Sequence, residues 1–198
     1  ITGGKKLTGT IETNTSKNGA VALLCASLLN KGITTLHKVP RIEEVHRLTE
    51  VLESIGMRTE WKDSTLIITP PKTLALKNIN QEAAARTRSI IMFIGALIHR
   101  LPKFSLPQSG GCKLGSRTVK PHFYALENFG VTIKTTEKAF VVNTIKKTAG
   151  EIVLYESGDT VTENALFAAA GRSETTIIKY ASANYMVQEV CNFLTKLG

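Results

Sequence analysis

Residues 17–32 read KNGAVALLCASLLNKG, and they are followed by ITTLHKV at 33–39 and RIEEVHRLTEVLESIG at 41–56. The first run is apolar on nearly every side, as in a helix buried at the centre of a domain. In the third run apolar residues recur every three or four positions, which predicts an amphipathic helix. MRTEW at 57–61 and TLIIT at 65–69 then predict two strands. This order of a helix, a strand, a helix and two strands decides the fold class.

The same order returns twice, as a weak internal repeat. RSIIMFIGALIHR, FSLP, TVKPHFYALENFG and the hairpin VTIKT with AFVVNT form a second unit over 88–144. TENALFAAAGRSE, TTIIKY and NYMVQEVCNFLTKLG form a third over 162–198, without a closing hairpin. We therefore expect an α/β fold of three βαβαββ-like units about a pseudo-threefold axis, with their sheets outside and their first helices inside. The incomplete third unit suggests a part of a longer protein.

The composition excludes several classes of protein. The chain has 198 residues, of which 42% are hydrophobic and 21% charged, which is typical of a globular fold and not of disorder, collagen or a coiled coil. The longest apolar run, from Ile90 to Ile98, is about half of the ~18 residues that a membrane span needs. No secretory leader opens the chain, so we expect a cytoplasmic protein without a membrane partner.

The charge favours an anionic partner. Twenty-five Lys and Arg residues against sixteen Asp and Glu residues give a net charge of +9. The basic residues form no block, and aromatic residues make up only 6% of the chain, which is few for stacking on nucleic acid bases. We therefore expect no nucleic acid partner; a nucleic-acid binder would be recognised by a steep loss of binding with salt.

The starts of the three first helices are candidate anion sites. Buried helices packed side by side would bring their N-termini, with free N–H groups, to one face. Lys17-Asn18 and Arg88-Ser89 stand at matching starts one repeat apart, and Thr160, Thr162, Glu163 and Asn164 occupy the third position. A phosphate or carboxylate site is one interpretation, and a solvated cation at each helix end is the alternative.

A glycine-rich segment, QSGGCKLGSR at 108–117, is the second candidate. Cys112, with Lys113 and Arg117 nearby, would have a depressed pKa and act as nucleophile or general acid. The alternative is a plain glycine-rich turn with an incidental cysteine. Cys25 and Cys191 lie on apolar helix faces and are expected to be inert core residues. The odd number of cysteines, without a C-x-x-C pair, predicts free thiols and no zinc site.

The ordered motifs resemble the UDP-N-acetylglucosamine 1-carboxyvinyltransferases, a family of enolpyruvyl transferases in bacterial peptidoglycan synthesis. The resemblance covers all 198 residues but only the first half of such an enzyme. Its landmarks are GGKKLTGTI, Ser16 to Ala20, Arg88-Ser89-Ile90 with Gly95-Ala96-Leu97, Leu106-Pro107, Gly110-Gly111-Cys112, Leu114 to Arg117, His122 and Thr162-Glu163-Asn164. The resemblance implies the inside-out α/β barrel of repeated βαβαββ units with buried central helices.

The resemblance also implies an activity, which is enolpyruvyl transfer from phosphoenolpyruvate to the 3′-hydroxyl of UDP-N-acetylglucosamine, without a metal or other cofactor. Lys17 resembles the lysine that contacts phosphoenolpyruvate, with Asn18 beside it, and Cys112 resembles the loop cysteine that protonates the enolpyruvyl methylene and reacts with fosfomycin. Arg88 and Arg117 resemble arginines that grip the anionic substrates. The nucleotide end is implied for Arg117, Thr118, Val119, Lys120 and Pro121, with His122 next to them, and for a second loop of Glu156, Ser157, Gly158 and Asp159.

The family plan implies a division of the chain and a missing partner. Residues 1–16 would belong to the second domain, residues 17–198 would form the three-unit domain, and the rest of the second domain, with a general-base aspartate and another arginine, would follow. We therefore expect this chain alone to bind weakly and to turn over little.

Some positions depart from the family pattern. Gly158-Asp159-Thr160-Val161 replaces Ser-Val-Gly-Ala, and an aspartate beside a diphosphate is unfavourable unless it points elsewhere. Lys120 replaces an aspartate, and Ala183 to Met186 replace Arg-Glu-Pro-Glu. The alternatives are therefore a catalytically silent sugar-nucleotide-binding paralogue and the shikimate-pathway enolpyruvyl transferase. The Gly-Gly-Cys loop argues against the latter.

Overall fold

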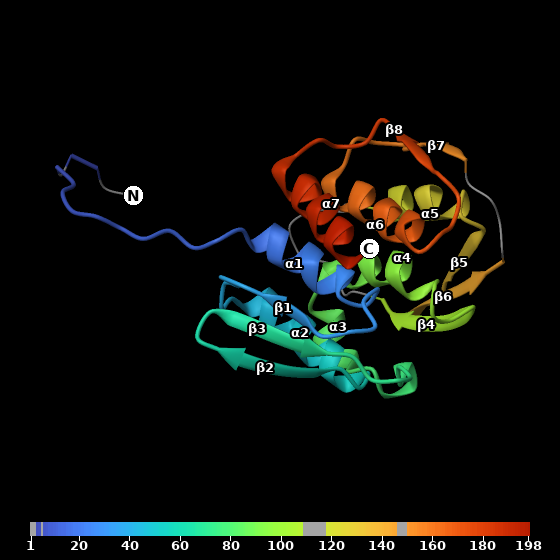
Figure 1. Ribbon diagram of the computed structural model, residues 1–198, viewed down its shortest axis with the longest axis horizontal. Coiled ribbons are helices and arrows are strands. Elements are labelled where there is room, and N and C mark those ends of the chain that lie inside the picture. Colours follow the sequence, from blue (N-terminus) through green and yellow to red (C-terminus); the bar gives the residue numbers. More distant parts are fainter. Residues whose placement is uncertain (1–2, 5, 109–117, 146–149) are drawn as a thin grey trace.

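The computed structural model describes residues 3–4, 6–108, 118–145 and 150–198. Three small sheets lie at the periphery and helices fill the middle, as Figure 1 shows. The expected fold class, with sheets outside and the first helix of each unit inside, is confirmed. Residues 6–15 have no regular structure and run away from this body as an exposed tail.

The first unit follows the order read from the sequence. It contains α1 (Lys17–Ala26), β1 (Thr34–Leu36), α2 (Glu43–Ser54), β2 (Arg58–Lys62) and β3 (Thr65–Thr69). Its antiparallel sheet has the order β1-β3-β2, so the hairpin β2-β3 folds back onto β1.

The second unit repeats this sheet. It contains η1 (Leu76–Asn78), α3 (Gln81–Ala85), the 3₁₀ helix η2 (Arg88–Met92), α4 (Phe93–Leu97), β4 (Lys103–Pro107), α5 (Lys120–Glu127), β5 (Val131–Thr135) and β6 (Ala139–Thr144). The sheet order β4-β6-β5 matches that of the first unit, and the predicted hairpin over 131–144 is confirmed.

The third unit is built from β7 (Glu151–Val153), α6 (Asp159–Ala170), β8 (Ile177–Lys179) and α7 (Tyr185–Leu197). β7 and β8 pair in parallel across α6, which is the βαβ start of a βαβαββ unit. Among the described residues this leading strand occurs only here. In the second unit, residues 76–85 form the short helices η1 and α3 before η2.

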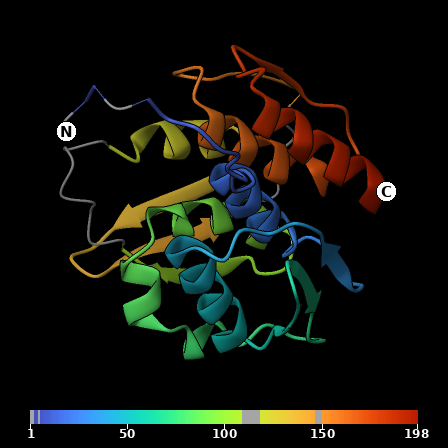
Figure 2. The ribbon, with the colours of Figure 1, turned by 90° about the vertical axis from the view of Figure 1, so that its left-hand side faces the viewer.

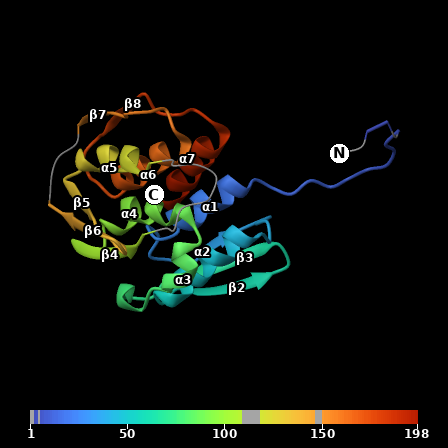
Figure 3. The same cartoon turned by 180° about the vertical axis from the view of Figure 1, so that it is seen from behind.

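The core is formed mainly where the first helices meet. α1 packs against α2, α4, α6 and α7, and α4 also packs against α6, as Figure 3 shows from behind. Leu24 of α1, Phe93 of α4 and Phe167 of α6 are fully buried. Each such side chain contributes about 1.5–3 kcal/mol through removal of apolar surface from water. The apolar runs that predicted central helices are thus explained by burial on all sides.

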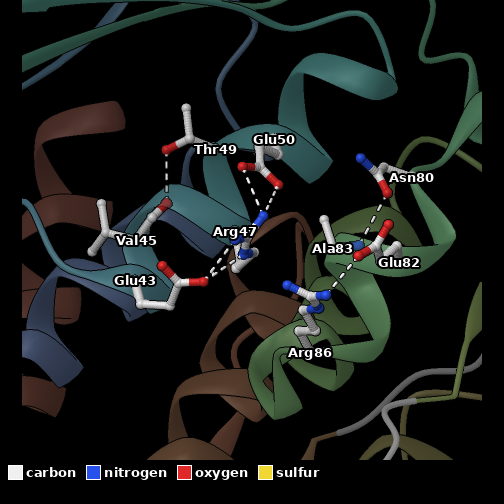
Figure 4. A network of polar contacts seen from close by, with 9 residues as sticks. All are labelled: Glu43, Val45, Arg47, Thr49, Glu50, Asn80, Glu82, Ala83 and Arg86. Atoms are coloured by element: carbon white, nitrogen blue, oxygen red, sulfur yellow. Dashed lines mark hydrogen bonds and ion pairs between the residues drawn. The ribbon is translucent and has the colours of Figure 1, made fainter.

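Polar contacts on the outer face fix α2 and α3 (Figure 4). Arg47 of α2 pairs with Glu43 one turn before it and Glu50 one turn after it. The side chain of Asn80 caps α3 by accepting a hydrogen bond from the Ala83 N–H at 3.0 Å. The cap defines the start of the short α3, which lies immediately before η2, whose first residue is Arg88.

A cavity of about 620 Å³ lies between β1, α1 and α7. It is on the side of β1 that carries no neighbouring strand. No helix among the described residues has the combination of length and apolar character needed to span a bilayer.

Candidate active site

Lys17 is the first residue of α1, where Ser16 caps the helix by accepting a hydrogen bond from the Gly19 N–H at 3.0 Å. The Lys17 ammonium lies 2.5 Å from a carboxylate oxygen of Glu44, at the start of α2. Lys17 is therefore not simply a solvated cation. About half of its side chain is exposed, at 54%, so it remains accessible to a ligand.

Glu44 joins the start of the first unit to the start of the second. Its other carboxylate oxygen accepts hydrogen bonds from Ser89 at 2.6 Å and from Thr87 at 3.3 Å, on either side of Arg88. Burial acts to raise the pKa of Glu44, but the hydrogen bonds from Lys17, Ser89 and Thr87 outweigh it and lower the pKa. Glu44 is thus an anion that fixes Lys17 beside the Arg88 segment.

Arg88 connects this pair to the third unit. It is half-buried, and its Nη2 donates to the carbonyl oxygen of Thr118 at 3.2 Å, just before α5. Its charge also acts on His122 of α5, whose pKa is lowered to about 3, first by burial and then by Arg88. His122 therefore stays neutral at physiological pH and is buried, with 6% of its surface exposed.

The ring of His122 faces α6. Its Nδ1 accepts from the Asn164 amide at 3.1 Å, and its Nε2 lies 3.5 Å from the Thr160 hydroxyl. The starts of the three units are thus linked by a contact chain: Lys17 bonds Glu44, Glu44 bonds Thr87 and Ser89 on either side of Arg88, and Arg88 bonds the Thr118 carbonyl. The charge of Arg88 then acts on His122, which lies beside Thr160. Figure 2 views the molecule from this side, with the start of α1 near the centre.

The third helix start differs from the expectation. α6 begins at Asp159, so Thr162, Glu163 and Asn164 lie in its second turn and are buried instead of standing at its open end. The first residues of α1, η2 and α6 are equally spaced along the chain; they are Lys17, Arg88 and Asp159. An acidic residue at a helix start is favoured by the macrodipole, which opposes a cation there.

Asp159 is turned toward the start of α7. One carboxylate oxygen accepts from the Ser182 hydroxyl at 2.6 Å, and the other from the Asn184 amide at 3.2 Å. Asn184 belongs to the segment from Ala183 to Met186, and both this segment and Asp159 are positions where the sequence is expected to depart from the family pattern. Both departures belong to one local structure.

The other predicted site residues surround this contact chain or fall outside the described part. Asn18 follows Lys17 and is exposed, Lys120 is exposed at the start of α5, Val119 is half-buried before it, and Pro121 is buried. Glu156 and Gly158 are half-buried and Ser157 is exposed, in the loop that leads into α6. Cys112 and Arg117 lie outside the described residues.

Of the two described cysteines, Cys25 is buried in α1 as expected, and burial raises the pKa of its thiol. Cys191 is only partly buried on α7, so its interpretation as a core residue is wrong. The reason is that this face of α7 has less covering structure than α1. Burial still raises the pKa of the Cys191 thiol.

The sequence did not reveal the roles of Glu44 and Asn164. Glu44 is one of two consecutive acidic residues at a helix start, and nothing in the pattern distinguishes it from Glu43. Asn164 was expected at the helix start, but its amide points into the core. Among the described residues no group of three or more His, Cys, Asp or Glu side chains is arranged to hold a metal ion.

Comparisons with known proteins identify the family of the chain. The family model of EPSP synthase (3-phosphoshikimate 1-carboxyvinyltransferase) matches residues 1–198. The UDP-N-acetylglucosamine 1-carboxyvinyltransferase of Bradyrhizobium diazoefficiens is 32% identical over 198 residues, which are 100% of this chain and 46% of that protein. A protein of the same name from Treponema denticola is 33% identical, with 46% of its length covered. The chain thus spans about half the length of the curated relatives it matches.

Solved structures share the fold at lower identity. The enolpyruvyl transferase NikO from Streptomyces tendae has a TM-score of 0.82 at 18% identity, over 99% of this chain and 46% of that one. An EPSP synthase from Acinetobacter baumannii has a TM-score of 0.63 at 15% identity, over 91% of this chain and 42% of that one. Because the family model covers every residue and the fold agrees, the chain belongs to the EPSP synthase family of enolpyruvyl transferases.

Proposed function

We propose that this chain is one half of an enzyme that transfers the enolpyruvyl group of phosphoenolpyruvate to the 3′-hydroxyl of UDP-N-acetylglucosamine, the first committed step of peptidoglycan synthesis. The observation that carries the proposal is the contact chain that brings Lys17 and Arg88, two cations at helix starts, to one face. Two cations on one face suit the binding of phosphate and carboxylate groups. Curated relatives that match the whole chain at 32–33% identity carry the name of that activity.

In the proposed reaction the 3′-hydroxyl gives its proton to the general base of the second domain as its oxygen forms a bond to C2 of phosphoenolpyruvate, while C3 gains a proton and the C2–C3 double bond becomes single. The resulting tetrahedral intermediate then loses phosphate from C2 and a proton from C3, so that the enolpyruvyl ether remains. We propose Cys112 as the proton donor to C3 and Lys17, with Asn18, as the contact to the phosphate. Fixed cations such as Lys17, Arg88 and Arg117 stabilise the anionic intermediate most where water is excluded.

The nucleotide end of the acceptor is proposed to lie along Thr118 to His122 and along Glu156 to Asp159. The orientation of Asp159 supports this, because its carboxylate is bonded to Ser182 and Asn184 and so is held by those partners. His122 would contribute through its position under this surface, since it is buried.

The missing parts of the site are proposed to come from the rest of the same protein. Residues 1–16 would join a second domain, which fits the exposure of Leu7 at 92% and Ile11 at 87%. The second domain would add the general base and close the cleft. A cytoplasmic location is part of the proposal, and the unpaired thiols of Cys25 and Cys191 are typical of a reducing compartment.

The test is intact-mass spectrometry of the protein's full-length chain with fosfomycin, with and without UDP-N-acetylglucosamine. We expect one adduct, located on Cys112, that forms faster with the sugar nucleotide. The Cys112→Ala variant is the matched control and should give none. Absence of an adduct on a folded full-length wild-type chain would favour a silent binding protein or another acceptor.

A further inference from the structure

The second central helix is interrupted by a side chain from the third unit. In a continuous α-helix the Gly95 N–H would donate to the Ile91 carbonyl. Here the Gly95 N–H donates to Oδ1 of Asn164 at 2.9 Å, and Nδ2 of Asn164 donates to the Ile91 carbonyl at 3.2 Å. The amide of Asn164 is thus inserted into the hydrogen-bond ladder. Such an insertion changes the course of a helix, and here η2 is 3₁₀ and the α-helical part begins only at Phe93.

Glycine at position 95 permits this insertion. A Cβ atom there would overlap with the backbone oxygen and with Oδ1 of Asn164. The side chain of Asn164 is completely buried, and a buried amide is costly unless its polar atoms are paired. All of them are, because the second N–H of its Nδ2 is available for Nδ1 of His122 at 3.1 Å.

The insertion determines where Arg88 points. A 3₁₀ helix turns roughly 20° more per residue than an α-helix, so over the four steps from Arg88 to Met92 the difference is roughly 80°. A continuous helix would therefore place the Arg88 guanidinium on another side of the helix. The bond from Arg88 to the Thr118 carbonyl joins η2 to the segment before α5, and Asn164 holds α5 through His122.

We propose that Asn164 is a positioning residue of the enolpyruvyl transfer site, which orients Arg88 through η2 and fixes the neutral tautomer of His122 beside it. This inference rests on the proposed function. Packing alone does not require an inserted amide. With an apolar residue at position 164, η2 and α4 could form one continuous helix, in which the Gly95 N–H and the Ile91 carbonyl would bond to each other.

The experiment compares three variants of the full-length chain. Asn164→Asp keeps an acceptor for the Gly95 N–H but loses both donors, and Asn164→Ser is a smaller second variant in case the first does not fold. Phe167→Leu is the stability control, since Phe167 lies in the same helix and is fully buried, and the substitution leaves its carbonyl oxygen, the partner of His99, in place. Steady-state kinetics give kcat and KM for phosphoenolpyruvate, and ¹⁵N chemical shifts of labelled histidine report the tautomer of His122.

We expect the Asn164 variants to raise KM for phosphoenolpyruvate at least about tenfold. The ¹⁵N shifts of His122 should no longer show the Nε2–H tautomer in these variants. Phe167→Leu, at equal thermal destabilisation, should keep KM within about twofold of wild type. Equal kinetics for the Asn164 variants and Phe167→Leu, with an unchanged tautomer, would overturn the positioning role alone. A wild-type chain without transfer activity would overturn the proposed function and this inference together.

Discussion

Glu163 is a single residue whose burial has a measurable cost. It lies in the second turn of α6, only 2% of its surface is exposed, and its Oε1 has no hydrogen-bond partner among the described residues. Burial, together with the charge of Asp159, raises its pKa to about 7. The pKa of His122 has the opposite shift, because burial and Arg88 disfavour the charged form of the imidazole.

These shifts predict a pH dependence. Between pH 4.5 and about 7 the native chain keeps a proton on Glu163 that the unfolded chain releases, so the Glu163 contribution to the free energy of unfolding falls as pH rises. Glu163→Gln removes that loss. We expect its stability relative to wild type to increase by roughly 3 kcal/mol between about pH 4 and pH 8, at about 1.4 kcal/mol per pKa unit.

Urea unfolding at several pH values measures this difference. His122 contributes with the opposite sign, since its folded-state pKa is depressed, but it is present in both chains and cancels in the comparison. A difference between the two chains that does not change with pH would show that Glu163 is not protonated in the native state.

The thiols offer a second prediction at the residue scale. Burial raises the pKa of the Cys25 thiol and also that of Cys191, which is less buried. A raised pKa reduces the fraction of each thiol that is present as the reactive thiolate. We expect Cys112 to be alkylated by iodoacetamide at least about ten times faster than either, because it is flanked by basic residues in the sequence. Peptide mass spectrometry over time gives the three rates. Equal rates would contradict the prediction, and in urea all three should converge.

At the scale of elements, the crossing of α4 and α6 depends on the absence of a side chain at Gly95. Gly95→Ala would introduce a methyl group against Asn164, and overpacking of this kind costs about 1–3 kcal/mol. Gly150→Ala is the matched control, since a Cβ there meets no atom within 4 Å, and it should change stability by less than about 0.5 kcal/mol. Urea denaturation of both variants measures the two costs, and equal values would mean that α4 and α6 separate easily.

The elements also explain why some predictions from the sequence were incomplete. Apolar periodicity located α2 and α7 and both hairpins, because each has one face in the core. It did not reveal the change from 3₁₀ to α within residues 88–97, since that change is caused by an amide from another unit. The pairing of Asp159 with Ser182 and Asn184 is equally invisible in a linear pattern.

At the scale of the whole molecule, three units bring their starts to one face, and we propose that this face is half of a closed cleft. The proposal predicts that the 198-residue chain binds UDP-N-acetylglucosamine much more weakly than the full-length protein, by about a hundredfold or more, because half of the contacts and the exclusion of water are missing. Titration calorimetry of both forms measures the ratio. Comparable affinities would mean that this chain holds the complete nucleotide site.

The sequence by itself determined the order of the elements, the three-unit plan, the family and the positions of Lys17 and Arg88 as helix starts one repeat apart. These properties are local or periodic, so burial of one helix face or repetition along the chain is enough to express them. The tertiary structure decided that Glu44 pairs with Lys17, that Asp159 faces α7, and that Asn164 divides the second central helix. Those contacts join residues far apart in the chain, and only the packing of the three units against one another brings their atoms within hydrogen-bond distance.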